Sequence, residues 1–558
     1  MEIDIASILR ESPILVFFVV ICGGLLVGRC KAGVVELGST TGVLLVGLLF
    51  GHLGFDSEPI LGTFGFTIFI FAVGLQAGPT FFNAFATDGT RYVILAVGVS
   101  AASMGLAVAA GRLIGLDYGM SAGLLAGALT STPTLAGAQD ALASGIAHVP
   151  DGLTADAARN NIGVAYAITY VFGTIGLILF IRYFPALFRI DLPGEALRVA
   201  RERGFVNTGR AAASSRSLPL IRAYRVPAKI VGRSHAELRA ARESSGYLLG
   251  VKRDGVFTEA VGDDFVYEPG DLISVVGSLA EHARARSVIG QEVFDPDLLD
   301  FRIVTKEIVI MVAEVAGKTI GELDLQRGFG CLALRLERAS MSLPLDATIP
   351  LQRGDRLTVS GEAALVQKLA DQLGRVDADR TETDLLTFSL GIGAGVLLGM
   401  VMIRLGGVSI GLGSAGGLLL LGILLGFLRS RYPTFGGVPT AARKVLMELG
   451  LVLFMASVGL NAGGGVVDGF LEAGPELVIA GIAVTLTPVV LAYLFGTRVL
   501  RMNPAILLGA ITGSMTSTPS LNIVTDAAKS DVPALGYAGT YAFANVLLTF
   551  AGTWIMTI

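Results

Sequence analysis

The stretch that decides the fold is Gly127-Ala128-Leu129-Thr130-Ser131-Thr132-Pro133-Thr134-Leu135, and a second copy follows as Gly513-Ser514-Met515-Thr516-Ser517-Thr518-Pro519-Ser520-Leu521. Both copies lie inside long, apolar, glycine-rich segments. Proline lacks an N–H and its ring clashes with the preceding turn, so each copy predicts an interrupted helix. At membrane depth such a break must be covered by protein or by a water-filled cavity. Two breaks at matching places in two halves of a chain indicate the binding site of a transporter.

The composition indicates a polytopic membrane protein. Of the 558 residues, 53% are hydrophobic and only 16% are charged, whereas soluble proteins carry about 25% charged residues. The net charge of −4 is small for this length and indicates no nucleic-acid partner. Lysine and arginine are concentrated between Arg189 and Arg380. The chain is therefore predicted to consist of two membrane regions that flank a soluble one.

The residue types that carry metal or covalent chemistry form no recognisable pattern. Cys22, Cys30 and Cys331 have neither metal-ligand nor disulfide spacing, and the four histidines are scattered. No nucleophile stands beside a base. We therefore expect a protein that is not an enzyme and that uses no metal and no cofactor.

The two membrane regions contain the same series of apolar segments. The first repeat, residues 1–190, has segments near 12–29, 37–53, 60–76, 91–115, 118–146 and 161–183. The second repeat, residues 381–558, has them near 385–403, 412–428, 445–462, 475–497, 503–527 and 533–556. Short blocks recur in the same order, including Val73–Gly78 with Val458–Gly463 and Tyr166–Phe172 with Tyr537–Phe543. A membrane span needs about 20 apolar residues, and five segments of the first repeat meet that condition.

The distribution of positive charge favours a re-entrant form for the two interrupted segments. Lysine and arginine in short loops stay on the cytoplasmic side. If each interrupted segment enters and leaves on one face, every repeat crosses five times and most basic loop residues lie on the face of the soluble region. Because five is odd, the second repeat is inverted. We predict an α-helical membrane protein of two inverted five-helix repeats, each with a re-entrant broken hairpin, with residues 190–380 cytoplasmic.

The central region is predicted to hold two small α+β domains. A charged linker at 191–217 leads to similar units at 218–292 and 299–376. Each unit ends with a Gly-Asp turn before an apolar strand, namely Gly270-Asp271 and Gly354-Asp355. A Gly-Asp pair flanked by alternating apolar residues is typical of a β-hairpin.

The two Thr-Ser-Thr-Pro blocks, with two tandem soluble units between them, resemble the aspartate–alanine exchanger family of bacterial transporters. The two soluble units resemble the carboxy-terminal domain of regulators of K⁺ conductance. The resemblance covers both membrane repeats and the insert. It implies an antiporter of the bacterial inner membrane, a homodimer in the lipid bilayer, which exchanges small carboxylate-bearing solutes such as amino acids. Members differ in substrate, so the resemblance leaves the substrate open. The soluble units have two interpretations: a sensor of a small, nucleotide-like ligand, or a dimerisation element.

The candidate substrate-binding residues are the polar residues of the two copies. No lysine or arginine lies in either copy, so the backbone N–H groups freed by each break and the positive end of the following half-helix would attract a carboxylate. The set comprises Thr130, Ser131, Thr132, Pro133 and Thr134 with Thr516, Ser517, Thr518, Pro519 and Ser520. The alternative is that these hydroxyls bond to the preceding turn of their own helix.

Four further polar residues occupy matching positions in the two repeats. Gln76 and Asn461 are candidates for the same cavity, or for hydrogen bonds between helices. Asp140 and Asp526 are candidates for cation coupling, or for the surface ends of the hairpins. A ligand-gated ion channel or a cation/proton antiporter is the alternative function, although neither a run of filter carbonyls nor a charged ring is evident.

Overall fold

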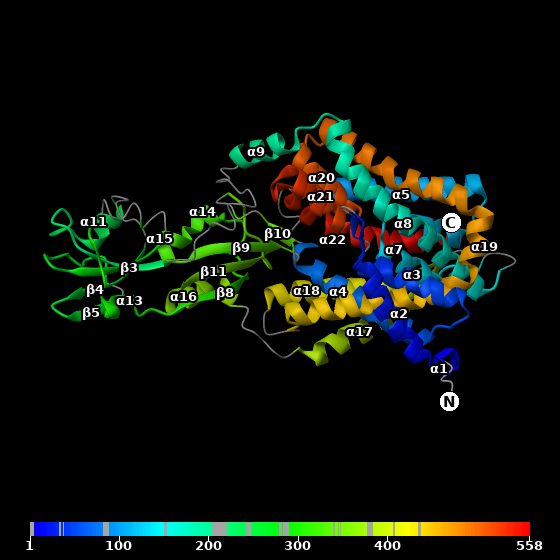
Figure 1. The fold of residues 1–558 in the computed structure, drawn as a ribbon, viewed down its shortest axis with the longest axis horizontal. Helices are drawn as coiled ribbons and strands as arrows, with labels where there is room; N and C mark the ends of the chain where they lie inside the picture. The colour runs from blue at the N-terminus through cyan, green and yellow to red at the C-terminus, as the bar shows by residue number, and fades with distance from the viewer. Residues whose placement is uncertain are drawn as a thin grey trace. The chain divides into compact units, whose positions relative to one another are not determined.

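The computed structural model of the chain divides into two compact units. One comprises residues 1–196 and 380–558, and the other comprises residues 197–379. The structure describes residues 5–32, 35–36, 38–81, 89–149, 153–202, 220–240, 247–259, 261–277, 282, 290–338, 341–343, 345, 348–376, 383–405, 408–432 and 437–558. Most of the predicted linker, from residue 203 on, lies outside these ranges. Figure 1 shows both units as ribbons and labels many of their helices and strands.

The first unit is almost entirely helical. Its first half contains α1 (Ile5–Glu11), α2 (Pro13–Gly28), α3 (Ser39–His52), α4 (Pro59–Phe81), α5 (Thr90–Ile114), α6 (Tyr118–Ala128), α7 (Thr132–Ala143) and α8 (Ala155–Leu187). Its second half contains α17 (Leu385–Gly399), α18 (Gly413–Arg431), α19 (Thr440–Arg498), α20 (Pro504–Ser514), α21 (Thr518–Ala528) and α22 (Val532–Ile555). Helix α9 (Leu192–Glu202) follows α8. The apolar segments seen in the sequence therefore correspond to helices in the same order.

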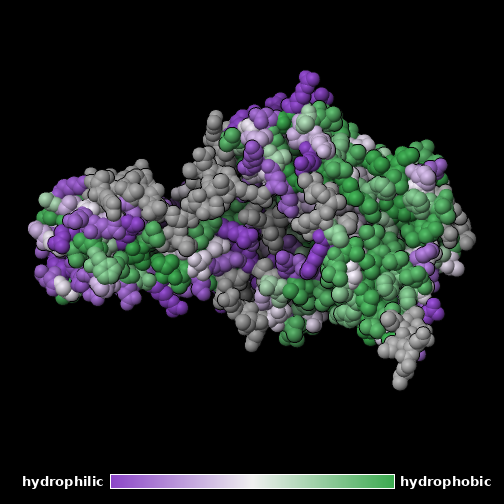
Figure 2. Space-filling view, viewed as in Figure 1, coloured by the Kyte–Doolittle hydropathy of each residue, from purple (hydrophilic) through white to green (hydrophobic). Residues whose placement is uncertain are grey.

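The apolar surface of this unit agrees with a membrane protein. Six described stretches are long and apolar enough to cross a membrane: 59–79, 90–114, 155–187, 441–467, 474–498 and 532–555. Helix α5 exposes large apolar side chains such as Ile94, Val97 and Leu113. The space-filling view shows a broad hydrophobic surface over these helices (Figure 2). Side chains of this kind suit contact with lipid tails, so the chain is a multi-pass membrane protein.

Helix α19 is one hydrogen-bonded element where two segments were predicted. The Tyr166 hydroxyl of α8 donates to the Met455 sulfur, and Thr169, one turn further along α8, packs against Gly481. A straight helix would place Met455 and Gly481 about 39 Å apart. Helix α19 must therefore turn back sharply between its arms, which keep the two apolar stretches predicted from the sequence.

The two halves are built from equivalent contacts and also pack on each other. Gly42 of α3 lies against Gly24 of α2 with no room for a Cβ, and Gly417 of α18 lies in the same way against Gly395 of α17. A two-stranded hairpin follows the first helix of each pair, with strands β1 (Lys31–Ala32) and β2 (Val35–Glu36), or β13 (Met402–Leu405) and β14 (Val408–Gly411). Across the halves, α3 packs on α19 and α18 packs on α4. The halves therefore form one interlocked helical body.

The second unit contains two five-stranded antiparallel sheets with the same strand order. The first sheet is β5-β4-β6-β3-β7 and the second is β10-β9-β11-β8-β12. The strands of the first are β3 (Leu220–Arg225), β4 (Tyr247–Arg253), β5 (Val256–Glu259), β6 (Leu272–Gly277) and β7 (Glu292–Val293). Those of the second are β8 (Ile303–Ile310), β9 (Leu332–Arg338), β10 (Met341–Leu343), β11 (Arg356–Glu362) and β12 (Gly374–Val376).

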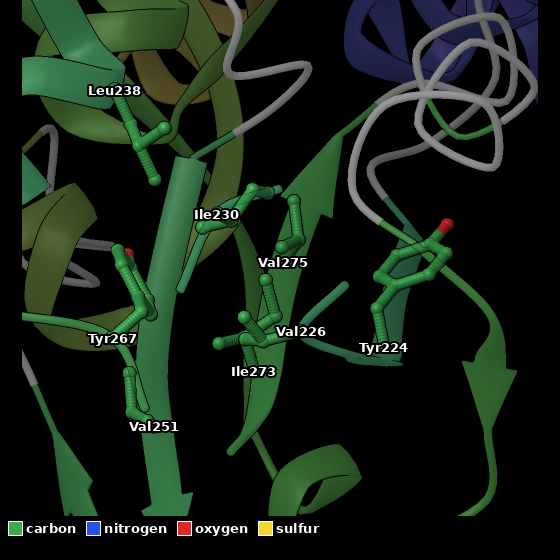
Figure 3. Close-up of a cluster of buried hydrophobic side chains, with 8 residues drawn as sticks. All are labelled: Tyr224, Val226, Ile230, Leu238, Val251, Tyr267, Ile273 and Val275. Atoms are coloured by element: carbon green, nitrogen blue, oxygen red, sulfur yellow. The ribbon is translucent and has the colours of Figure 1, made fainter. Parts of the chain in front are cut away.

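Short helices accompany both sheets, and each sheet has an apolar core. The helices are α11 (His235–Ala240), α13 (Pro296–Leu299), α14 (Ile320–Leu323), α15 (Leu325–Phe329) and α16 (Ala363–Leu373). Helix α16 packs on β8, β11 and β12. Figure 3 shows the core of the first sheet, formed by Tyr224, Val226, Ile230, Leu238, Val251, Tyr267, Ile273 and Val275. Burial of these side chains is the main source of stability for so small a domain.

The two Gly-Asp turns are not the β-hairpins that the sequence predicted. Strand β6 follows the Gly270-Asp271 turn but pairs with β4 and β3 rather than with the preceding β5. The aspartates bind an arginine instead. Both carboxylate oxygens of Asp271 accept hydrogen bonds from Arg253 at 2.8 Å, and both of Asp355 accept from Arg338 at 2.7 Å. Each turn therefore ties a central strand to the neighbouring β4 or β9.

This ion pair gives the first sheet a pH-dependent stability. Burial by itself would raise the pKa of Asp271, but hydrogen bonds from Arg253 and from the backbone N–H of Glu268 lower it below its ordinary value of 3.8. A lowered folded-state pKa contributes stability above the ordinary value, and this contribution is lost as the pH falls through the lowered pKa. We expect the melting temperature of the intact protein to exceed that of Asp271→Asn at pH 7 and the difference to shrink below about pH 4. A difference that stays constant with pH would contradict this.

Candidate functional site

The first interrupted segment breaks at Leu129–Ser131, between α6 and α7. Thr130 adopts a left-handed conformation with φ of 52°, which ends α6 and redirects the chain. Ser131 is the N-cap of α7, and its side chain accepts a hydrogen bond from the backbone N–H of Thr134. Pro133 lies in the first turn of α7, where a missing N–H costs nothing. The break therefore precedes the proline, and the strained threonine, rather than the proline, forms it.

The second interrupted segment repeats this geometry between α20 and α21. Thr516 has a φ of 53°, Ser517 is the N-cap position of α21, and Pro519 lies in the first turn. The Ser517 and Ser520 hydroxyls are 2.9 Å apart, as the Ser131 and Thr134 hydroxyls are 2.8 Å apart in the first segment. The structure therefore places the predicted residues of each copy together at one helix start.

The second interrupted segment is a hairpin, because both of its ends lie beside the start of α22. Gly509 in α20 packs against the backbone of Pro533, the second residue of α22. Helix α21 ends at Ala528, and only residues 529–531 separate it from α22. In the first segment, Gly119 of α6 packs against Ala158 near the start of α8. Each break is therefore the tip of a hairpin, and these two tips are called tip 1 (129–134) and tip 2 (515–520) below.

A buried tyrosine contacts each tip. The Tyr537 hydroxyl of α22 is 2.9 Å from the Thr518 hydroxyl, and Tyr166 of α8 is within hydrogen-bonding reach of Thr132. Both tyrosines are fully buried. The sequence shows these tyrosines only as members of a recurring block, because their contact with the tips depends on how α8 and α22 pack.

A side chain from the second half of the chain also forms a hydrogen bond beside tip 1. The Thr485 hydroxyl of α19 donates a hydrogen bond of 2.8 Å to the carbonyl oxygen of Ala128, the last residue of α6. The break leaves this carbonyl without a partner in its own helix, so a hydroxyl from the other repeat satisfies it. No sequence pattern around Thr485 indicates this role.

The two tips differ in exposure. Ser131, Thr132 and Thr134 are at most 6% exposed, and Pro133 is also buried. Thr518 and Pro519 are exposed, whereas Ser517 and Ser520 are buried. The structure therefore encloses one tip and leaves part of the other accessible.

Gln76 and Asn461 lie far from each other. Helices α4 and α19 pack in antiparallel fashion, since Gly62 meets Ser457 and Gly65 meets Gly450. Asn461 lies at the end where α4 begins, where its side chain accepts a hydrogen bond of 2.6 Å from Ser57. Gln76 is 17 residues into α4, about 25 Å along the helix. The structure therefore does not bring these two amides into one cavity.

Asp140 holds the start of α18, a role that neither interpretation of the sequence foresaw. Its carboxylate is buried and accepts a hydrogen bond of 2.9 Å from the backbone N–H of Ala415, one of the N–H groups that α18 cannot satisfy itself. It therefore ties the first hairpin to the second half of the chain. The equivalent Asp526 is exposed.

We expect Asp140→Ala to destabilise the protein, since the loss of an N-terminal helix cap costs about 1 kcal/mol. Asp526→Ala, at the exposed equivalent position, is the matched control and should change the melting temperature less. Thermal unfolding of both purified variants in detergent measures this. An unchanged melting temperature of Asp140→Ala would mean that the contact with α18 contributes nothing.

Comparison with known families identifies both parts of the chain. Residues 16–186 and again 387–557 match the sequence model of the Asp-Al_Ex family, described as a predicted permease membrane region. Residues 307–374 match the TrkA-C domain. No solved structure matches the chain. The two Asp-Al_Ex matches together cover more than half of the sequence and coincide with the two sets of membrane helices.

Proposed function

Since this chain belongs to the aspartate–alanine exchanger family of predicted permeases, we propose that it is a secondary exchanger of small carboxylate-bearing solutes such as amino acids. The cargo is bound between tip 1 and tip 2, and the protein works by alternating access. The observation that carries this proposal is the pair of helix starts at the two tips, each preceded by a break and surrounded by hydroxyl groups.

The tips offer what a carboxylate needs without a basic side chain. The first turns of α7 and α21 present the backbone N–H groups of Thr132 and Thr518 and the positive end of a helix dipole, equivalent to about half a charge. The hydroxyls of Thr132 and Thr518 stand at the first position of each helix. Tyr166 and Tyr537 fix the orientation of these hydroxyls. Tip 1 is buried, and there such oriented dipoles bind an anion more strongly than they would in water.

The repeated contacts support two inverted five-helix repeats with re-entrant hairpins. Two equivalent hairpins, each packed on the last long helix of its own repeat, are the arrangement found at the binding sites of many secondary transporters. In this topology the soluble unit and the loops that carry Arg498 and Arg501 lie on the cytoplasmic face. We also propose, as the family resemblance implies, that the protein is a bacterial inner-membrane homodimer.

The soluble unit acts as a regulator of the transport cycle. One TrkA-C domain is matched at 307–374, and the equal strand order and the equal Arg–Asp pair support a second domain of the same kind at 218–292 beside one at 299–376. A small, nucleotide-like ligand bound to these domains would bias the membrane helices toward one state.

Counterflow in proteoliposomes tests the proposed exchange. Vesicles are loaded with one candidate amino acid or dicarboxylate, and the uptake of the same labelled compound is measured. We expect internal substrate to stimulate uptake. Ion conductance without counterflow would instead identify a ligand-gated channel, and uptake driven only by a cation gradient would identify a cation/proton antiporter.

A further inference from the structure

One face of α21 is exposed along its whole length and carries polar side chains. Thr518, Asn522 and Asp526 are exposed at intervals of four residues, which places them in a stripe along one side of the helix. This set is called the α21 stripe below. The opposite face is buried and consists of Ser520, Leu521, Val524, Thr525 and Ala528.

Lipid is not a suitable environment for the α21 stripe. Much of the exposed helix surface of this unit is apolar, for example at Ile479 and Ile482 on α19. Within the described part of α21, no large apolar side chain is exposed. A hydroxyl, an amide and a carboxylate lose their hydrogen bonds to water if they face hydrocarbon, so polar intramembrane residues face the protein or a water-filled cavity.

The equivalent face of α7 is closed. Thr132, Ala136 and Asp140 occupy the corresponding positions and are 6%, 0% and 9% exposed. Two hairpins of matching sequence therefore differ in access: the structure is open along α21 and sealed along α7. Such a difference between equivalent elements is expected of a single state of an alternating-access cycle.

We propose that the α21 stripe lines the water-filled route by which cargo passes between tip 2 and the cytoplasmic face. This inference rests on the proposed function for the identity of the cargo. The route begins at Thr518 and ends beside Asp526 and the exposed Lys529. Since this end of the route offers both a carboxylate and an ammonium group, it suits a zwitterionic amino acid, which carries both opposite charges.

Single cysteines introduced into the intact protein, with Cys22, Cys30 and Cys331 replaced by serine, test the route. Asn522→Cys reports on the stripe, Thr525→Cys on the buried face of the same helix, and Ala136→Cys on the equivalent position of α7. Inverted membrane vesicles and intact cells are treated with membrane-impermeant thiosulfonates, one cationic and one anionic. We expect Asn522→Cys to react in inverted vesicles only, with both reagents and at least tenfold faster than either control.

Three results would overturn the proposal. Asn522→Cys could be inert in inverted vesicles, it could react from the outer face, or it could form a disulfide with a second copy of the chain, which would make the stripe a dimer contact. Labelling needs no transport, so it separates the two proposals. Labelling without counterflow would support the route and contradict the exchange function. Counterflow with an inert Asn522→Cys would support the exchange function and contradict the route.

Discussion

The double variant Thr132→Val, Thr518→Val is expected to lose most of its affinity for substrate. Valine has the shape of threonine but no hydroxyl, so each replacement removes one polar partner of the cargo and one partner of the tyrosine behind it. The loss of the contact with the tyrosine lowers the stability of the protein, whereas a cargo oxygen left without its partner costs about 1–3 kcal/mol of binding free energy. This corresponds to about a tenfold weaker affinity for each tip and about a hundredfold for both. The measurement is the substrate concentration at half-maximal counterflow.

Two controls separate binding from folding in this experiment. Thr525→Val lies on α21 but its hydroxyl donates to the Asn522 carbonyl of its own helix, so it should leave the affinity unchanged. Tyr537→Phe removes only the support behind Thr518 and should have a smaller effect than Thr518→Val. If the double variant exchanges substrate with unchanged affinity, the hydroxyls of the two tips do not belong to the site.

The variant Gly509→Ala is expected to lose much of the folded protein. A Cβ at this position would overlap the backbone of Pro533, including its carbonyl oxygen. Backbone atoms cannot swing aside as a side chain does, so α20 and α22 would have to separate. Overpacking of this kind typically costs about 1–3 kcal/mol and occasionally more. The measurement is the yield and the melting temperature of the monodisperse protein in detergent.

The matched control for this prediction is Gly98→Ala in α5. A Cβ there meets no atom within 4 Å, and alanine favours a helix by up to about 1 kcal/mol over glycine. This variant should therefore be as stable as the original protein or more stable. Equal behaviour of Gly509→Ala would show that α20 and α22 are less tightly packed than described.

The sequence predicted the helices and both breaks because these features depend on local composition. Apolar length sets the helices, and the repeated Thr-Ser-Thr-Pro block marks the breaks. The detail at each break was less predictable. Proline adjacent to a break suggested that proline causes it, whereas Thr130 and Thr516 in left-handed conformations form it. The backbone preference of threonine does not predict this conformation, because threonine rarely adopts a positive φ.

Contacts between the two halves could not be predicted from the sequence. Thr485 caps a carbonyl of the first hairpin, and Asp140 caps a helix of the second half. Each requires knowledge of which helices are neighbours in space. The prediction of hairpins at the Gly-Asp turns was wrong for the same reason. The local sequence is typical of a hairpin, but strand pairing across the sheet places β6 beside β4 and β3.

The interlocking of the two halves has a consequence for biosynthesis. The Thr553 hydroxyl of α22 donates to the carbonyl of Gly137 in α7, a residue 416 positions earlier. When the first half has been translated and inserted, Gly137 of α7 has no contact with α22. This contact can form only after the last helix has been translated. The packing of α7 is therefore completed only after α22 has been synthesised.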